Sequence, residues 1–249
     1  MPGHPAVRAA RAALTELGRV LVPQQCPGCG AWDVALCMAC GAGLTGPVRR
    51  VESGAPRLHD ARHGPLPAWG VATYDGPVRA AVVAWKDRGR ADLGPVLEAV
   101  MERAAGDLAR TLDAVCDGSG ILLVPVPSTP GARRRRGADL VGGLASAAAR
   151  GLDGVGKEVR VTPALARRRG VRDQVGLGAR GRGRNTARTF VARRGAAPVA
   201  GRWCLVVDDV LTTGSTIAAC ARALASSGAL VVGALVLAAT PAPVDPGEV

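Results

Sequence analysis

The hydrophobic residues of the chain form short apolar runs that alternate with longer stretches of helical period. A short apolar run bounded by turn residues is typical of a strand that is covered on both faces of a parallel sheet. The alternation of such strands with helices predicts an α/β fold, in which helices flank a mainly parallel sheet. Strands are predicted at residues 70–74, 121–126, 158–161, 204–207 and 230–239.

Helices are predicted where apolar residues recur three and four positions apart. Pro77 is well placed to open one of them, and Gly228 stops the last. A short amphipathic helix is predicted near the N-terminus, and because its polar face is not densely basic, we expect it to pack against protein and not against a membrane. The predicted helices cover residues 6–22, 78–85, 93–115, 138–150 and 215–227.

Two C-x-x-C pairs, separated by seven residues, lie near the N-terminus. Four thiolates at this spacing can surround one tetrahedral metal ion, and the glycines that follow each pair permit tight turns. The alternatives are a redox-active pair, which is usually single, and disulfides, which a reducing cytoplasm disfavours. The pattern favours a structural zinc ion bound by Cys26, Cys29, Cys37 and Cys40.

The chain length of 249 residues accommodates one α/β domain and a small additional module. Between the cysteines and the first predicted strand, the sequence is rich in Pro, Gly, Arg and His and has no hydrophobic period, which indicates a linker. We therefore expect an N-terminal helix in residues 1–25, a zinc module in 26–44, a linker in 45–68, the main domain in 69–240 and a tail in 241–249.

The composition indicates a globular protein, because 48% of the residues are hydrophobic and only 21% are charged. No apolar run reaches the roughly 18 residues that would span a bilayer. The N-terminus also lacks the continuous apolar stretch of a secretory signal. These features predict a cytoplasmic protein that does not interact with membranes.

The net charge of +12 is concentrated in two places. Residues 167–194 contain ten arginines and one aspartate, and residues 133–136 are four consecutive arginines. Both clusters suit anionic ligands, either phosphates or nucleic acid. The aromatic content of 2% leaves few side chains on which bases could stack, which weakens the interpretation of a single-strand-binding protein.

Residues 204–216 combine an apolar strand, two carboxylates, a loop of hydroxyls and the start of a helix. In open α/β sheets ligands bind beyond the carboxyl ends of the strands, where Asp208 and Asp209 are predicted to lie. A loop that leads into a helix offers free N–H groups to a phosphate, and Gly214 permits a close approach. An ordinary strand–turn–helix would not require two acids followed by four hydroxyl residues. The stretch therefore predicts a ligand that carries a phosphate and either a diol or a bound metal.

A second candidate anion site follows the predicted strand 121–126. Residues 128–137 contain hydroxyls, glycines and arginines, and guanidinium groups match phosphate oxygens in pairs. A solvated basic loop is the alternative interpretation of this segment. The three histidines, His4, His59 and His63, all precede the main domain, which argues against a Ser–His–Asp or Cys–His mechanism there.

Residues 204–216 resemble the signature of the type I phosphoribosyltransferases: an apolar strand, two acids, then a Thr/Gly/Ser/Thr loop. The resemblance implies that Asp208 and Asp209 are the catalytic acids and hold the ribose hydroxyls of phosphoribosyl pyrophosphate (PRPP), assisted by Mg²⁺. It also implies that the loop cradles the 5′-phosphate of PRPP. The implied PRPP-binding residues are Val210, Leu211, Thr212, Thr213, Gly214, Ser215 and Thr216.

Over residues 26–240 the chain is similar to the ComF/GntX family, whose phosphoribosyltransferase-like domain follows a four-cysteine module. The family's Gly-Phe-Asn is replaced here by Gly137-Ala138-Asp139, so the role of that Asn is not carried over. The matching motifs are Tyr74-Asp75-Gly76-Pro77-Val78-Arg79, Trp85-Lys86-Asp87-Arg88-Gly89, Val124-Pro125-Val126-Pro127, Arg134-Arg-Arg-Gly137 and Gln174-Val-Gly176-Leu177 with Arg182, Arg184, Asn185 and Phe190.

The family resemblance implies two further groups of functional residues. One group would neutralise pyrophosphate and consists of Lys86, Ser128, Arg134 and Arg136. The other group would belong to a flexible hood over the active site and consists of Gln174, Arg182, Arg184 and Asn185.

Three functions are compatible with these features. The first is an enzyme of the glycosyltransferase class that transfers phosphoribose from PRPP to an acceptor that no motif identifies. The second is a non-catalytic ComF-type protein that acts in DNA uptake and competence by binding DNA or a DNA-processing partner. In the third, the four-cysteine module is the functional part, as an adaptor for nucleic acid or protein. The acid pair favours the first, and the scarcity of basic residues beside the cysteines disfavours the third.

Overall fold

The computed structural model describes residues 24–60, 64–168, 189–193 and 197–242. The predicted helix at 6–22, the predicted hood residues Gln174, Arg182, Arg184 and Asn185, and most of the predicted tail lie outside the described residues. The main sheet consists of β1 (Arg49–Arg50), β4 (Ala68–Thr73), β5 (Ile121–Pro125), β6 (Val159–Val161), β9 (Trp203–Leu211) and β10 (Leu230–Ala239).

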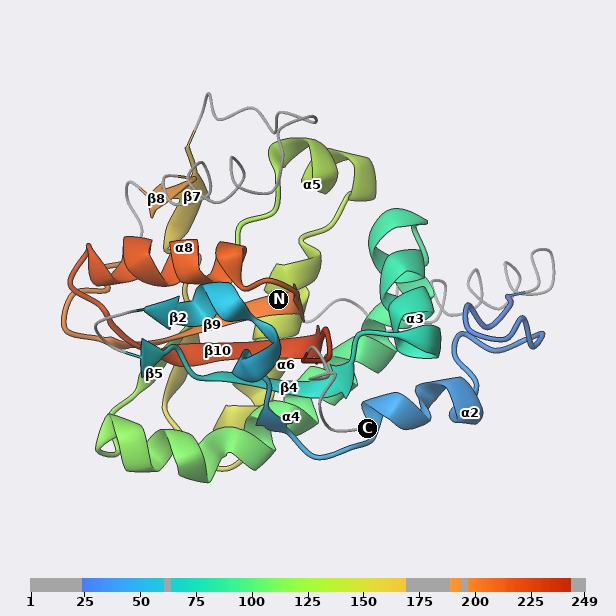
Figure 1. Cartoon of the computed structure of the whole chain (residues 1–249), viewed down its shortest axis with the longest axis horizontal. Helices are drawn as coiled ribbons and strands as arrows, with labels where there is room; N and C mark the ends of the chain where they lie inside the picture. Colours follow the sequence, from blue (N-terminus) through green and yellow to red (C-terminus); the bar gives the residue numbers. More distant parts are fainter. Residues whose placement is uncertain (1–23, 61–63, 169–188, 194–196, 243–249) are drawn as a thin grey trace, which may run out of the picture.

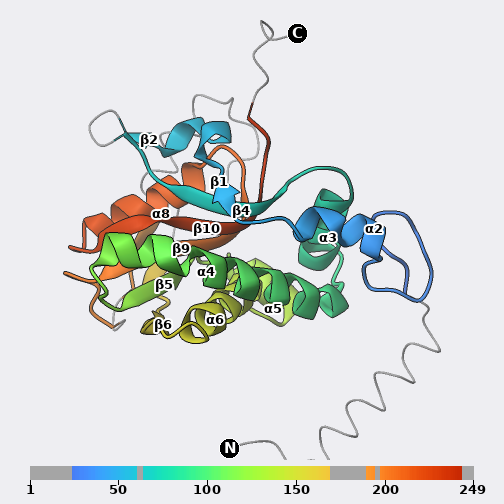
Figure 2. The same cartoon turned by 90° about the horizontal axis from the view of Figure 1, so that it is seen from below.

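The strands of this sheet, which lies at the centre of the molecule in Figure 1, follow the order β1-β4-β10-β9-β5-β6, as their labels in Figure 2 show. Strand β1 is antiparallel to β4, and every other neighbouring pair is parallel. The prediction of a mainly parallel sheet is therefore confirmed. Its flanking helices are α3 (Gly76–Asp87), α4 (Gly94–Cys116), α5 (Pro130–Arg136), α6 (Leu140–Asp153) and α8 (Ser215–Ala225), with α2 (Met38–Gly41) beside the cysteines.

Helices cover both faces of the sheet, so its central strands are apolar on both sides. Along β9, Leu205 and Val207 pack with α3, α4 and α6 on one face, while Cys204 and Val206 pack with α8 on the other. Successive residues of a strand point to opposite faces, which explains this alternation. Figure 2 shows α4 and α6 together on one side of the sheet and α8 on the other.

Helices α4 and α6 approach each other closely at two glycines. A Cβ on Gly151 of α6 would lie 1.9 Å from the carbonyl oxygen of Glu102 in α4, and a Cβ on Gly106 would lie 3.4 Å from the carbonyl oxygen of Gly151. The two backbones are thus in contact at this point, which fixes α6 and the segment that precedes it.

Gly151→Ala is expected to destabilise the protein by about 1–3 kcal/mol, because the added methyl group must push the two helix backbones apart. Gly143→Ala on the same helix is the matched control. Its methyl group would meet the carboxylate end of Glu98, which can move aside, and the change gains up to about 1 kcal/mol of helix propensity. Chemical denaturation measures both variants; equal stabilities would contradict the backbone contact.

Residues 45–68 are part of the core, which corrects the prediction of a linker. They contain β1, the 3₁₀ helices η2 (Glu52–Gly54) and η3 (Pro56–Leu58), and both strands of the hairpin, β2 (His59–Asp60) and β3 (Gly64–Pro65). The side chains of Val51, Ala55 and Leu58 are buried with α8. Pro and Gly interrupt the hydrophobic period here because the chain makes tight turns as it passes the edge of the sheet from one face to the other.

Two other segments differ from the sequence-based expectation. Residues 130–136, predicted to be part of a loop, form α5. The basic segment that begins at Arg167 leaves from an antiparallel pair, β7 (Leu165–Arg167) and β8 (Phe190–Ala192). The remaining short elements are η1 (Ala42–Leu44) and η4 (Ala91–Leu93).

Candidate active site

Strand β9 carries both predicted acids and extends beyond its neighbour β5. Its last pairing with β5 joins Val207 to Pro125, whereas its pairing with β10 continues to Leu211. Asp208 and Asp209 were expected just after the strand, but they lie within it. Aspartate is rare in strands, so the sequence suggested that the strand ends before Asp208. The pairing of β9 with β10 nevertheless continues past both acids. The acids therefore lie at an edge that β5 leaves open.

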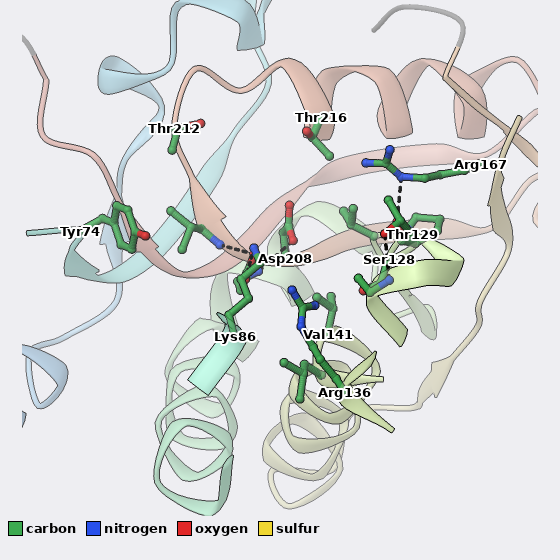
Figure 3. Close-up of a pocket in the computed structure, with 16 residues that line it drawn as sticks. Tyr74, Lys86, Ser128, Thr129, Arg136, Val141, Arg167, Asp208, Thr212 and Thr216 are labelled. Atoms are coloured by element: carbon green, nitrogen blue, oxygen red, sulfur yellow. Dashed lines mark hydrogen bonds and ion pairs between the residues drawn. The ribbon is translucent and has the colours of Figure 1, made fainter. Parts of the chain in front are cut away.

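A cavity of about 390 Å³ opens at this edge (Figure 3). It brings together eight of the predicted site residues: Lys86, Ser128, Arg136, Asp208, Asp209, Val210, Thr212 and Thr216. The predicted residues that do not line it are Arg134, Leu211, Thr213, Gly214 and Ser215. The rest of the lining consists of Tyr74, Val126, Pro127, Thr129, Ala132, Leu140, Val141 and Arg167.

Sequence reasoning did not single out Tyr74, Thr129 or Arg167 as site residues, although Thr129 and Arg167 fell within the basic segments expected to suit anions. Tyr74 follows β4 directly, so the rule that ligands bind beyond the carboxyl ends of parallel strands could have indicated it. Arg167 reaches the cavity from β7, which belongs to a separate two-stranded sheet. No local signal in the sequence connects this residue to the acids.

Asp209 is ion-paired with Lys86, which lies in the last turn of α3. The Nζ of Lys86 is 2.5 Å from Oδ2 of Asp209, and the carboxylate is almost fully buried. Burial acts to lower the pKa of Lys86, but the charge of Asp209 and the hydrogen bond to it raise that pKa above its usual value. The lysine is therefore held in its charged form beside the acids.

Asp208 is in a different electrostatic environment from Asp209. Its Oδ1 accepts a hydrogen bond of 2.9 Å from the backbone N–H of Asp209. Burial, and next the adjacent carboxylate of Asp209, raise the pKa of Asp208 well above its usual value. A cation that entered the cavity would favour ionisation of this acid, because an opposite charge nearby lowers the pKa of a carboxyl group.

The buried carboxyl group of Asp208 predicts a pH-dependent stability. Its pKa is raised in the folded chain, so between the unfolded and folded pKa values the folded state binds more protons. The free energy of unfolding therefore falls as pH rises through that range. Asp208→Asn removes this effect, so its stability relative to wild type should rise from about pH 4 toward neutrality. Urea unfolding at several pH values measures the difference; a constant difference would contradict the raised pKa.

The loop that joins β9 to α8 is built around Gly214. This residue has φ of +80°, a left-handed conformation that favours glycine, and a Cβ would lie 2.6 Å from Cγ of Leu58. The carbonyl of Thr213 accepts a hydrogen bond of 3.0 Å from the N–H of Arg57 in η3. The segment predicted to be a linker thus supports the loop from behind.

The start of α8 faces the same cavity, where Thr216 contributes to the lining. The first N–H groups of a helix have no acceptor within the helix, and no side chain of the described residues caps this one. The hydroxyls of Thr213 and Ser215 are 2.9 Å apart at its first turn. The free N–H groups and the positive end of the helix dipole favour an anion at this position.

Two guanidinium groups also line the cavity: Arg136 lies on the wall opposite α8, and Arg167 lies beside Thr216 (Figure 3). Arg136, at the end of α5, forms an ion pair of 3.3 Å with Asp87, and Figure 3 shows it on the same side as Lys86. Arg167 donates from Nε to the carbonyl of Pro127 at 3.4 Å and stacks over the ring of Phe190. Arg134, predicted to act with Arg136, is exposed on α5. The cavity thus combines two carboxylates, one helix N-terminus and three cationic side chains.

The four N-terminal cysteines form a separate cluster. Their Sγ atoms all lie within 4.8 Å of one another, with 3.8 Å between Cys26 and Cys37 and 3.6 Å between Cys29 and Cys37. A tetrahedral zinc ion with Zn–S bonds of about 2.3 Å requires sulfur atoms about 3.8 Å apart. All seven cysteines are free thiols, so the disulfide alternative is not present.

The environment of these thiols also suits a metal ion. Burial, and next the neighbouring thiols, raise the pKa of Cys40 to about 12. Burial acts to raise the pKa of Cys26 as well, but hydrogen bonds from the backbone N–H groups of Cys37, Cys29 and Gly28 lower it to about 6. Thiolates this close repel one another, so a bound cation would stabilise them. The cluster is compatible with a structural metal such as zinc.

Comparison with known proteins agrees with this geometry. Residues 136–247 match the family model of the phosphoribosyl transferase domain, a region that includes β9, the following loop and α8. A solved structure with a detectable likeness is a hypoxanthine phosphoribosyltransferase from Staphylococcus aureus, with 12% sequence identity, a TM-score of 0.36 and coverage of 59% of this chain and 69% of that one. No curated protein matches the chain. The family match, together with the mainly parallel sheet and its flanking helices, confirms the predicted phosphoribosyltransferase-like fold.

No helix in the described part of the chain is both long and apolar enough to cross a membrane.

Proposed function

We propose that the protein binds PRPP with Mg²⁺ in the cavity and transfers the phosphoribosyl group to an acceptor. One observation carries the proposal: the buried acids of β9 share one cavity with the N-terminus of α8 and with three cationic side chains. A sugar phosphate that also bears pyrophosphate needs these three kinds of group together. The match to the phosphoribosyl transferase domain supports the same conclusion.

Each group would bind a different part of PRPP. Asp208 and Asp209 would accept hydrogen bonds from the ribose hydroxyls, and their oxygens are suitable ligands for Mg²⁺. When bound, Mg²⁺ would offset the negative charge of the departing pyrophosphate. The loop at Gly214 and the first turn of α8 would hold the 5′-phosphate. Lys86 and Arg136, on the wall opposite α8, would contact the pyrophosphate, with Ser128 as a hydroxyl donor.

The reaction would require little proton transfer from the protein. The bond between the anomeric carbon and pyrophosphate breaks, and pyrophosphate keeps the electron pair. A lone pair of the acceptor forms the new bond to carbon, and the acceptor loses a proton. Positioning by the acids and charge stabilisation by the cations would supply the rate enhancement. The lack of histidine in residues 69–240 is compatible with such chemistry.

Calorimetric titration with PRPP and Mg²⁺ tests the proposal. Ribose 5-phosphate and pyrophosphate, titrated separately, probe the loop and the cationic wall. We expect all three to bind, with PRPP tightest because it engages both regions at once. If none of the three binds, the proposed function is wrong. If PRPP binds, release of pyrophosphate is then measured with a panel of bases and amines; no release with any of them would count against transfer.

Arg136→Ala is expected to weaken PRPP and pyrophosphate binding about tenfold, because a hydrogen bond between charged groups contributes about 1.5–3 kcal/mol. Ribose 5-phosphate affinity should change less than twofold by the same reasoning. Arg134→Ala removes the same charge from an exposed position of α5 outside the cavity lining and is the matched control. Equal losses in the two variants would indicate a general charge effect.

A second candidate function is a ComF-type role in DNA uptake through DNA or partner binding. The net charge of +12 favours it, together with the exposed Arg133 and Arg134 on α5 near the cavity. Binding of this kind depends steeply on salt, because each phosphate contact releases counterions. Affinity for single-stranded and duplex DNA at several salt concentrations tests it; affinity that does not depend on salt would exclude phosphate contacts.

A further inference from the structure

The cysteine cluster packs against α3, the helix that carries Lys86. A Cβ on Gly28, between Cys26 and Cys29, would lie 3.0 Å from Cβ of Pro77 in the first turn of α3. A Cβ on Gly43 would lie 2.9 Å from Cγ2 of Val78. Figures 1 and 2 both show α2 alongside α3. The segment that holds the cluster is therefore in close contact with one end of this helix.

Arg90 connects the same segment to the other end of α3. Its backbone N–H donates to the carbonyl of Ala84 at 3.1 Å, in the last turn of the helix. Its guanidinium donates to the carbonyl of Gln25 at 2.7 Å and to that of Ala35 at 3.5 Å. Gln25 precedes the first cysteine pair and Ala35 precedes the second, so one side chain bonds the backbone that leads into each pair.

The guanidinium of Arg90 is held in place by Asp92. Two bonds, of 2.8 Å from Nε and 2.7 Å from Nη2, reach the two carboxylate oxygens of Asp92. A planar guanidinium that bonds a carboxylate in this way has a fixed orientation. Arg90 is thus a rigid connection, and it starts only four residues after Lys86.

We propose that the metal centre supports the anion site through α3, with Arg90 as the positioning residue. A bound ion orders the backbone around the cysteines, and Arg90 transmits that order to the last turn of α3. Lys86 is then held in its ion pair with Asp209 at the cavity. Without the ion, a closed four-cysteine site loses its structure. Arg90 then loses fixed acceptors, and Lys86 is held less firmly.

This inference rests on the proposed function where PRPP is the ligand. The coupling also works in reverse, because linkage between two sites is reciprocal. If the metal raises the affinity for PRPP by some factor, PRPP raises the affinity for the metal by the same factor. A cluster that only stabilises its own segment would show no such effect.

The test compares Arg90→Ala with Arg103→Ala in the full chain loaded with zinc. Arg103 also donates to a carbonyl of the N-terminal segment, that of Leu44 at 2.9 Å, but it lies on α4. We expect Arg90→Ala to lower PRPP affinity about tenfold, because lost bonds from a charged donor are worth about a factor of ten. Arg103→Ala should change PRPP affinity less than about twofold, because within the described part of the chain Arg103 does not bond to α3. Arg90→Lys, which keeps the charge but not the fixed fork, should recover only part of the affinity.

Zinc removal and a ligand variant complete the test. Cys40→Ser, introduced into the wild-type chain, should weaken PRPP binding. The same change introduced into Arg90→Ala should cause little further loss of PRPP affinity, because both changes act on one connection. Losses that multiply would overturn the proposal. So would equal PRPP affinity of zinc-loaded and zinc-depleted wild type.

Hydrogen exchange separates a failure of this proposal from a failure of the proposed function. Amides of α3 should exchange faster in zinc-depleted wild type and in Arg90→Ala than in loaded wild type, whether or not PRPP binds. If loaded wild type does not bind PRPP, the proposed function fails while exchange still tests the link to α3. Exchange in α3 that is indifferent to zinc and to Arg90 would overturn the link itself.

Discussion

Asp208→Asn/Asp209→Asn should abolish PRPP binding measured by calorimetry in the presence of Mg²⁺. Each carboxylate would accept a hydrogen bond from a ribose hydroxyl and provide a ligand oxygen to Mg²⁺, and asparagine weakens both contacts. Bonds to a charged group contribute about 1.5–3 kcal/mol each, so two losses correspond to a decrease of at least about 100-fold. Binding to pyrophosphate alone should decrease much less, because Lys86 and Arg136 remain.

The same double variant should fold normally. Burial disfavours the charge of Asp208, so removing this charge does not destabilise the folded chain. The side chain of Lys86 is partly exposed, so water can solvate its charge when Asp209 is replaced by asparagine. Asp107→Asn/Asp153→Asn removes two charges from exposed helix positions and controls for the change in net charge. PRPP affinity that remains within tenfold of wild type in the site variant would exclude the acid pair as the ribose site.

Cys26→Ser and Cys40→Ser should each lose the metal and lower the melting temperature. Structural zinc in small zinc-finger peptides contributes about 10–16 kcal/mol of apparent binding free energy to folding. If about 3 kcal/mol of this stabilises the whole chain, the melting temperature falls by about 6–12 °C. Metal content by mass spectrometry and thermal unfolding measure the two effects.

A buried thiol outside the cluster provides the control for these variants. Cys220→Ala removes a fully buried thiol from α8 and should keep one metal ion per chain. Its own loss of stability reports the cost of a small cavity. Retention of the ion by both serine variants would contradict the assignment of the cluster as a four-thiolate site.

The apolar strands could be predicted from the sequence because their signal is local. The boundaries of β10 were predicted at 230–239 and agree with the structure, and β5 differs by one residue. Strand β9 was predicted four residues too short at its end. Its extension depends on pairing with β10, which outweighs the low strand propensity of the two aspartates.

The parts that could not be predicted depend on contacts between residues distant in sequence. Residues 45–68 lack a hydrophobic period, yet Leu58 packs against the loop at Gly214. At the site, the acids and several basic residues were visible as motifs. The approach of Arg167 from β7 and the connection from Arg90 to the cysteine segment arise only from the fold.

The position of β10 in the sheet has a consequence for synthesis on the ribosome. Strands β4 and β5 are not neighbours in the sheet, because β10 and β9 lie between them, and both of these strands are translated after β4 and β5. Lys86 and Arg136 are therefore translated long before the carboxylates that they face. A nascent chain that stalls before residue 230 exposes an unpaired edge of β4, which is prone to aggregate. Because β10 pairs with both β4 and β9, the cavity walls that follow these two strands come together only after residues 230–239 have been added.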